Sequence, residues 1–340
     1  MKRQSLSKIL RGAFKYLIPL FISVGLCYLL FTGVDFGEMM DKIKDEGNNL
    51  WWIALALFIS IFSHIFRALR WNIQLKAVNI HAPISTLVNS IFGTYAVNLV
   101  FPRLGEIWRS GYISQRQNAS FPVVLGSMVA ERMADAVMVL LLVVVTFLLA
   151  SGEIMEFVRE YPEFYNMVIT LISSPWLWIS FAVAVGIVWI IFRRFPENKI
   201  LNKIKDLVKG LWEGFAAIGK MEGKGKWLLY SFLVWGCYFL QMYFAFFAFP
   251  ETAGVVAQSG AVAVLVCFML SSIAMVIPSN GGIGPWQMAV MFGLSMYGVT
   301  SVPALAFANL VLGTQTLLLI LLGLYAFISI SLDRKRRVES

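Results

Sequence analysis

The motifs FPRLGEIWR at residues 101–109 and AERMAD at residues 130–135 carry charges in a chain that is 59% hydrophobic. The second motif lies inside a run that otherwise consists of Val, Leu, Met and Ala. A charge near the centre of a bilayer costs roughly 2.5–3.5 kcal/mol on insertion scales. Glu131, Arg132 and Asp135 must therefore pair with one another or face a protein interior or a wet cavity. We look for function at this place.

Long apolar runs separated by charged loops are typical of a polytopic membrane protein. The 340 residues include 27 Phe and 11 Trp, and only 14% are charged. Such runs fit no soluble class of protein. The net charge of +9 arises from Lys and Arg between the apolar runs, where these residues set the topology. We therefore expect membrane lipids as partners and no nucleic acid.

The sequence shows no motif for a cofactor, a metal or a catalytic nucleophile. His64 and His81 form no HExxH pair, and no P-loop or GxSxG motif occurs. Cys27, Cys237 and Cys267 have no second cysteine at metal spacing, so we interpret them as small hydrophobic residues. We expect no cofactor, no metal site and no enzymatic activity.

The distribution of charge predicts an all-α fold with about six full transmembrane helices. Basic segments mark the cytoplasmic side and acidic loops the outside, so both termini are predicted to be cytoplasmic. The predicted spans are residues 16–34, 50–66, 123–150, 164–192, 227–249 and 304–332. Arg67 and Arg70 follow the second span, where snorkelling to the interface is the simpler interpretation.

These spans form one transmembrane domain over residues 1–340. A first membrane half covers residues 16–150, residues 164–192 form a connecting span, and a second half covers residues 227–332. Residues 193–226 are basic and repeat apolar positions at helical spacing, which predicts an amphipathic helix on the cytoplasmic face. This helix serves either as a linker or to recruit anionic lipids. Residues 333–340 are a basic cytoplasmic tail.

Two further apolar segments contain Pro and Gly breaks, which predicts broken or re-entrant helical hairpins. Residues 84–117 are flanked by basic residues at both ends, so a single crossing would violate the charge asymmetry. Residues 252–332 contain no charged side chain and are interrupted by PSNGGIGP at residues 278–285. The two hairpins enter from opposite sides, as in the inverted repeats of transporters. Such broken segments are tolerated only where protein or water surrounds them.

The candidate binding residues lie on these hairpins and on the helices next to them. We expect Arg103 and Arg109 to attract phosphate through paired donors, with Glu106 orienting both at i,i+3 spacing. The charged motifs supply the candidates Arg70, Arg103, Gly105, Glu106, Arg109, Glu131, Arg132 and Asp135. The second hairpin supplies Pro278, Asn280, Gly281, Gly282, Gly284 and Gln287, with Asn309 and Gln315 as further lining residues.

Each group of candidates has a structural alternative. The first charged motif is equally consistent with a solvated topology loop, and the second with a buried structural ion network. Glycines in the second hairpin allow the backbone to turn tightly and approach a ligand, or allow helices to pack closely.

Taken in order, these motifs resemble the transmembrane region of lysylphosphatidylglycerol synthases and the flippase-like membrane proteins built from that region alone. The residues that carry the resemblance are Arg70-Trp71, Pro102-Arg103-Leu104-Gly105-Glu106 with Arg109, Glu131-Arg132 with Asp135, and Pro278 with Gly281-Gly282-Ile283-Gly284. The resemblance covers residues 16–331. Full synthases carry a cytosolic aminoacyl-transfer domain after this region, and the sequence ends at Ser340, so we expect no synthase activity. Many relatives have a Glu where this sequence has Gln287.

The resemblance and the charges together predict a protein of the bacterial inner membrane. We expect it to move an anionic phospholipid or a polyprenyl-linked headgroup between leaflets, by a process without an ATP site. One alternative is an integral transferase acting on lipid headgroups, with Glu131 or Asp135 as base. Another is a non-transporting partner that recruits or stabilises a lipid-synthesis enzyme. The oligomeric state does not follow from the sequence.

Overall fold

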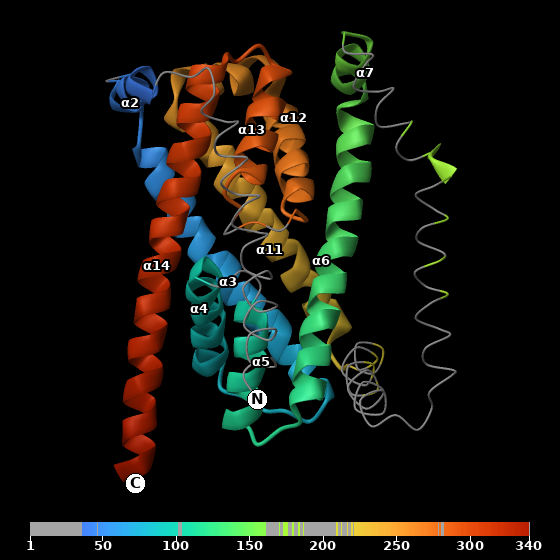
Figure 1. Ribbon diagram of the computed structural model, residues 1–340, viewed down its shortest axis with the longest axis vertical. Coiled ribbons are helices and arrows are strands. Elements are labelled where there is room, and N and C mark those ends of the chain that lie inside the picture. The colour runs from blue at the N-terminus through green and yellow to red at the C-terminus, as the bar shows by residue number, and fades with distance from the viewer. Residues whose placement is uncertain are drawn as a thin grey trace, which may run out of the picture.

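The computed structural model places a bundle of helices of unequal length around the charged motifs (Figure 1). It describes residues 36–45, 47–100, 104–160, 221–277, 279 and 282–339, together with positions 170, 173–175, 179, 183, 186, 209, 212, 216 and 219. Within these residues the ordered elements are helical. The predicted span at 16–34 lies outside the described residues, as do most of the predicted span at 164–192 and most of the predicted amphipathic segment.

Five helices of the described chain are long and apolar enough to cross a membrane. They are α3 (Trp51–Ala77), α6 (Phe121–Leu149), α11 (Lys224–Ala245), α12 (Pro250–Ala274) and α14 (Ser301–Glu339). Four of them correspond to predicted spans, and the fold is the predicted polytopic all-α class. However, α3 continues well beyond residue 66, so Arg67 and Arg70 lie inside the helix and not at its membrane boundary.

Each of the two predicted hairpins is present as a pair of helices. The first consists of α4 (Ile84–Val100) and α5 (Leu104–Arg116), and the second pairs α12 with α13 (Pro285–Ser295). Gly260 breaks α12 with φ 64° and ψ −155°, which leaves 14 residues, about 21 Å, in its second arm. That arm is shorter than the roughly 30 Å hydrocarbon core. The hairpins occupy opposite ends of the bundle, as predicted for an inverted repeat (Figure 1).

Two asparagine turns fix the first hairpin between α3 and α6. Asn79 follows α3 with φ 59°, and Asn118 follows α5 with φ 48°, in the left-handed region that ends many helices. After each turn a backbone N–H reaches the last helical turn, from Ile80 to Leu75 and from Ala119 to Ser114, both at 2.9 Å. The chain therefore reverses tightly on entering and on leaving the hairpin.

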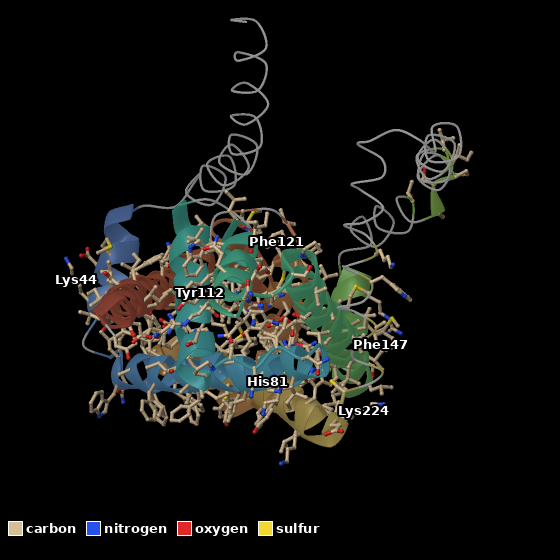
Figure 2. The ribbon with its side chains drawn as sticks, turned by 90° about the horizontal axis from the view of Figure 1, so that it is seen from below. Lys44, His81, Tyr112, Phe121, Phe147 and Lys224 are labelled. Carbon is tan, nitrogen blue, oxygen red and sulfur yellow. The ribbon has the colours of Figure 1, made fainter. Side chains whose placement is uncertain are left out.

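Two apolar clusters pack the bundle at different levels of α3. One gathers buried residues of the 3-10 turn η1 (Phe246–Ala248), α11, α12, α13 and α14 around the start of α3. The other gathers residues of α4, α5 and α6 around Trp71 and Leu75 near the end of α3. The outer face of α6 stays exposed, and Figure 2 shows Phe147 at the edge of the bundle. This face suits contact with lipid acyl chains.

Short helices cover the end of the bundle opposite the asparagine turns. They are α2 (Phe36–Lys44) and α7 (Ser151–Glu160), and both are helices where the sequence predicted acidic loops. Lys42 Nζ on α2 lies 2.6 Å from Glu251 Oε1 in the first turn of α12. This hydrogen bond raises the pKa of Lys42 above its ordinary value. The ion pair thereby ties α2 to the second hairpin.

Candidate functional site

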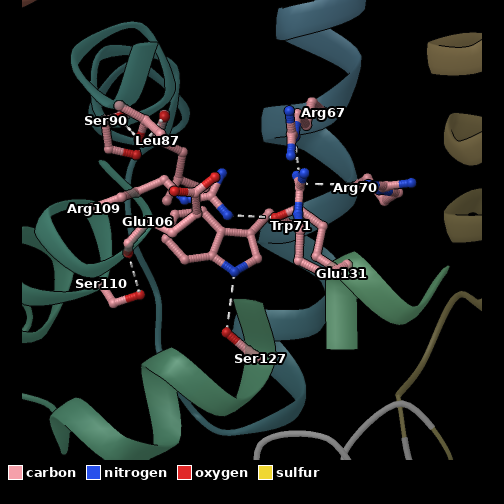
Figure 3. Close-up of polar contacts among 12 residues, drawn as sticks. Arg67, Arg70, Trp71, Leu87, Ser90, Glu106, Arg109, Ser110, Ser127 and Glu131 are labelled. Atoms are coloured by element: carbon pink, nitrogen blue, oxygen red, sulfur yellow. Dashed lines mark hydrogen bonds and ion pairs between the residues drawn. The ribbon is translucent and has the colours of Figure 1, made fainter. Parts of the chain in front are cut away.

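The charged residues of three helices, α3, α5 and α6, converge on one buried carboxylate. Glu131 on α6 is fully buried, and all four of its arginine partners are within hydrogen-bond reach. Its Oε1 accepts from Arg67 Nε at 2.5 Å and from Arg70 Nη2 at 3.4 Å, and its Oε2 accepts from Arg109 Nη2 at 2.5 Å. Figure 3 shows Arg67 and Arg70 arriving from α3 and Arg109 from α5. We call Arg67, Arg70, Arg109, Glu131, Arg132 and Asp135 the charge cluster.

Asp135 and Arg132 complete the cluster one helical turn along α6. Asp135 Oδ1 accepts from Arg70 Nη2 at 2.7 Å, and its Oδ2 lies 3.3 Å from Arg132 Nη2. The sequence predicted that the charges of this motif pair with one another or face a protein interior or a wet cavity, and the structure confirms that they pair. Arg132 is the most open member, because 40% of its side chain is exposed, whereas Arg70 and Glu131 have none exposed.

Aromatic groups hold two of the arginines in place. The guanidinium of Arg109 lies over the ring of Trp71, 4.1 Å from the centroid, which is a cation–π contact. The indole N–H of Trp71 in turn donates to Ser127 Oγ at 3.0 Å (Figure 3). Arg67 Nη1 donates to the hydroxyl of Tyr95 on α4 at 2.8 Å. Helices α3, α4, α5 and α6 therefore each contribute to the position of the cluster.

The cluster carries more positive than negative charge. Among the described residues it contains four arginines and two carboxylates, a surplus of two positive charges. Within the same part of the chain, the Nε atoms of Arg70, Arg109 and Arg132 are buried and have no hydrogen-bond partner. Buried arginines normally find partners for their donors. The arrangement can therefore accept an anion.

The spacing predicted that Glu106 orients Arg109, and this prediction is wrong. Arg109 turns towards Glu131, whereas Glu106 accepts from Asn98 Nδ2 at 3.3 Å on the facing helix of the hairpin. Asn98 Oδ1 also accepts from the backbone N–H of Gly105 at 2.7 Å. Glu106 and Gly105 thus hold α5 against α4. Arg103 lies outside the described residues, so its predicted contact with phosphate stays a prediction.

The second hairpin holds its candidate residues apart from the charge cluster. Gln287 on α13 accepts from the backbone N–H of Gly284 at 2.9 Å and donates to Asn309 on α14. Gly282 and Gly284 have φ of 86° and 92°, so they make the tight turn that leads into α13. Nothing described joins Gln287 to the charge cluster. Pro278, Asn280 and Gly281 lie outside the described residues.

Sequence reasoning missed several residues that the structure places at the site. Arg67, Trp71, Tyr95 and Ser127 were not among the candidates, although Arg67 was placed beside Arg70 at the end of the second predicted span. The missed signal is the continued helical period beyond residue 66, which carries Arg67 and Arg70 into the bundle instead of to its boundary. Tyr95 and Ser127 give no signal of their own, because only packing brings them to the arginines.

The described residues contain no group of three or more His, Cys, Asp or Glu placed to hold a metal ion. The polar residues of the site are instead arginines, carboxylates, amides and hydroxyls. A multi-pass membrane protein with a buried, positively biased charge cluster between a hairpin and its neighbouring helices is therefore the class that the fold and the site define.

Comparison with known proteins gives the family. The model of the "Lysylphosphatidylglycerol synthase TM region" matches residues 16–323. The "UPF0104 membrane protein PH1989" of Pyrococcus horikoshii is 25% identical over 250 residues, which cover 68% of this chain and 73% of the relative. No solved structure matches the chain. The chain belongs to the lysylphosphatidylglycerol synthase transmembrane-region family, as its motifs predicted.

Proposed function

We propose that the protein moves an anionic lipid headgroup, a phospholipid or a polyprenyl-linked phosphate, between the leaflets of a bacterial inner membrane. The observation that carries the proposal is the surplus of two positive charges in the charge cluster, with three buried guanidinium Nε donors unused among the described residues. Phosphate can accept hydrogen bonds from the paired N–H donors of several guanidinium groups at once. The family is named after enzymes of a membrane lipid, which supports a lipid as the ligand.

The position of the cluster supports passage rather than surface binding. Glu131 lies ten residues after Phe121, about 15 Å along α6 from the end of the bundle where the asparagine turns lie. This depth is near the middle of a hydrocarbon core of roughly 30 Å. A headgroup bound there has left the interface but is still surrounded by donors. The cluster would thus lower the main barrier to translocation, which is the transfer of charge into hydrocarbon.

In this mechanism Arg109 turns its donors from the carboxylate of Glu131 to the phosphate of the headgroup. It is held by Glu131 at 2.5 Å and by the face of Trp71, and its Nε has no described partner. An arriving phosphate would take donors from Arg109 and Arg132, while Glu131 keeps Arg67 and Arg70 in place. The carboxylate thereby prevents the four arginines from repelling one another before the headgroup arrives and after it leaves.

The test is fluorescent-lipid translocation in proteoliposomes, measured by quenching of the outer leaflet. Wild type, Arg109→Gln and Arg109→Lys are compared with phosphatidylglycerol, phosphatidylcholine and a polyprenyl phosphate as fluorescent probes. Loss of charge-assisted hydrogen bonds worth about 1.5–3 kcal/mol predicts a loss of roughly tenfold to a hundredfold for Arg109→Gln with anionic probes. Arg109→Lys keeps the charge but loses the paired planar donors of the guanidinium group, so an intermediate rate is expected.

Arg159→Gln is the matched control, because it removes the same charge from an exposed position on α7. It is expected to translocate lipid at the wild-type rate. If folded Arg109→Gln is as fast as wild type, or if wild type moves none of the probes, the proposal fails. Turnover of headgroups in detergent would then favour a transferase, and co-purification with a lipid-synthesis enzyme would favour a partner role.

A further inference from the structure

The face that α3 turns to the bundle is polar over most of its length. The positions at alternating spacings of three and four residues are Ile53, Ala56, Ser60, Ser63, Arg67, Arg70 and Gln74, and all are buried. The first two belong to an apolar cluster, but the five from Ser60 onward are polar. We call these five residues, with His64 beside them, the α3 polar seam. It rises about 21 Å from Ser60 to Gln74.

Polar groups from α4, α11 and α14 face this seam between Ser60 and Arg70. Gln315 on α14 donates to Ser60 Oγ at 2.9 Å and accepts from Gln241 on α11 at 2.7 Å. Ser231, also on α11, accepts from Arg70 at 3.4 Å. The rings of His64 and Tyr95 lie 4.7 Å apart between α3 and α4. The seam thus continues from the charge cluster towards the level of the amide pair of Gln241 and Gln315.

Several groups on the seam have unused hydrogen-bonding capacity. Among the described residues, both ring nitrogens of His64 and both side-chain amide atoms of Gln74 are buried and without a hydrogen-bond partner. His64 is 3% exposed and Gln74 is 2% exposed. They lie on either side of Arg67 and Arg70. Buried polar groups are normally hydrogen-bonded, and polar groups facing one another between membrane helices mark pathways for polar ligands.

We propose that the α3 polar seam is the hydrated route along which the headgroup moves to and from the charge cluster. This inference rests on the proposed function for the nature of the transported group, but the path itself follows from the polar residues of α3 and of the helices packed against them. Serine and amide side chains also join packed membrane helices through hydrogen bonds, as Ser60 and Gln315 do. His64 and Gln74 make no such bond among the described residues, so their polar atoms are left for water or a ligand. Ser60, Ser63 and His64 offer hydrogen bonds without charge, so they would pass a phosphate on without trapping it.

The closing experiment measures access of water-soluble reagents to single cysteines. In a chain with Cys27, Cys237 and Cys267 replaced by Ala, Ser60→Cys, Ser63→Cys and Ala68→Cys are introduced one at a time and treated in proteoliposomes with a membrane-impermeant methanethiosulfonate. Ser63 is fully buried, and its one hydrogen bond among the described residues is donated to the carbonyl of Ser60 in its own helix, so Ser63→Cys is a mild change. Ala68 is fully buried in an apolar cluster of the same helix and serves as the control.

Because thiol reactivity depends on access and ionisation, the two seam cysteines are expected to react at least about tenfold faster than Ala68→Cys. Equal rates at all three positions would overturn the route, whether or not lipid moves. The labelled proteins are then assayed for lipid translocation. Labelled Ser60→Cys and Ser63→Cys are expected to be at least about tenfold slower than before labelling, with labelled Ala68→Cys unchanged. An unchanged rate of lipid translocation after labelling at Ser60→Cys and Ser63→Cys would also overturn the route. The Arg109 variants test the proposed function separately from these two measurements.

Discussion

At the scale of single residues, Glu131 is the common acceptor that lets four arginines lie together. It has no exposed side-chain surface, and each arginine of the charge cluster has an ion pair with it. Asp135 is partly exposed and pairs with three of the same arginines. The two carboxylates therefore differ in how much positive charge would be left unbalanced and buried if each were neutralised.

Neutralising Glu131 is expected to cost far more stability than neutralising Asp135. Removing one partner of a buried ion pair lowers the free energy of unfolding by about 3–5 kcal/mol, because the remaining buried charge is left without an opposite charge. Glu131→Gln should therefore lower the thermal midpoint in detergent strongly, and Asp135→Asn only moderately. Tryptophan fluorescence on heating measures both. Equal midpoints for the two variants would show that Glu131 is not the main acceptor.

Two buried serines provide a second comparison at this scale. Ser90 and Ser127 both donate to a carbonyl three residues earlier in their own helix at 2.7 Å, but Ser127 also accepts the indole N–H of Trp71. Ser127→Ala leaves that buried N–H unsatisfied, which costs about 1–3 kcal/mol. Ser90→Ala removes only a local bond. The unfolding midpoint of Ser127→Ala should be clearly the lower, and a reversed order would contradict the assigned bond.

At the scale of elements, the first hairpin depends on the close approach of α4 and α5. A Cβ on Gly105 would collide with the carbonyl of Thr94 and with the side chain of Asn98. The same hairpin contacts α14 through Asn89, whose amide donates to Ser329 at 2.8 Å, and through Arg116, which pairs with Asp333 at 3.0 Å. The hairpin is thus held by close packing inside and by polar contacts outside.

A methyl group at Gly105 is therefore expected to loosen the hairpin. Gly105→Ala should destabilise the protein by roughly 1–3 kcal/mol, because backbone atoms cannot yield as a flexible side chain does. Gly111→Ala is the control on the same helix, since its Cβ would meet only a ring carbon of Phe121 at 3.9 Å. There the better helix propensity of Ala predicts no loss or a small gain. The thermal midpoints in detergent separate the two variants, and an unchanged midpoint for Gly105→Ala would contradict the packing.

At the scale of the whole molecule, the orientation in the membrane determines which leaflet each hairpin faces. The C-terminal end of α14 lies at the end of the bundle with the asparagine turns, and α7 lies at the opposite end (Figure 1). The last segment of the chain reads DRKRR at residues 333–337. By the positive-inside rule, we propose from the excess of Lys and Arg that this end lies in the cytoplasm.

This orientation predicts the outcome of reporter fusions. A fluorescent protein after Ser340 should be fluorescent in a bacterial host, and alkaline phosphatase fused after Gly152 should be active. The reverse pattern would show the opposite orientation of the protein, in which each hairpin faces the other leaflet. Lys2, Arg3 and Lys8 at the other terminus predict that a fluorescent protein before Met1 is also fluorescent.

The sequence by itself determined the membrane class, the family and the residues of the second charged motif. These follow from local properties, because a long apolar run must lie in lipid and a charge inside it must be compensated. The hairpins were also predictable, since Pro and Gly breaks and the charge at their ends act within the segment. The resemblance added an ordered set of motifs, which the family match confirms.

Only the tertiary structure decided which charges pair. Arg109 had a partner available at i,i+3 in Glu106, but it reaches Glu131 on another helix, because the hairpin places α5 against α6. The sequence predicted that Arg67 and Arg70 lie at the membrane boundary, but α3 continues past them and both are buried. The polarity of the α3 seam likewise acquires meaning only when α4, α11 and α14 pack against it. Pairing energies between segments far apart in sequence depend on packing that no local pattern encodes.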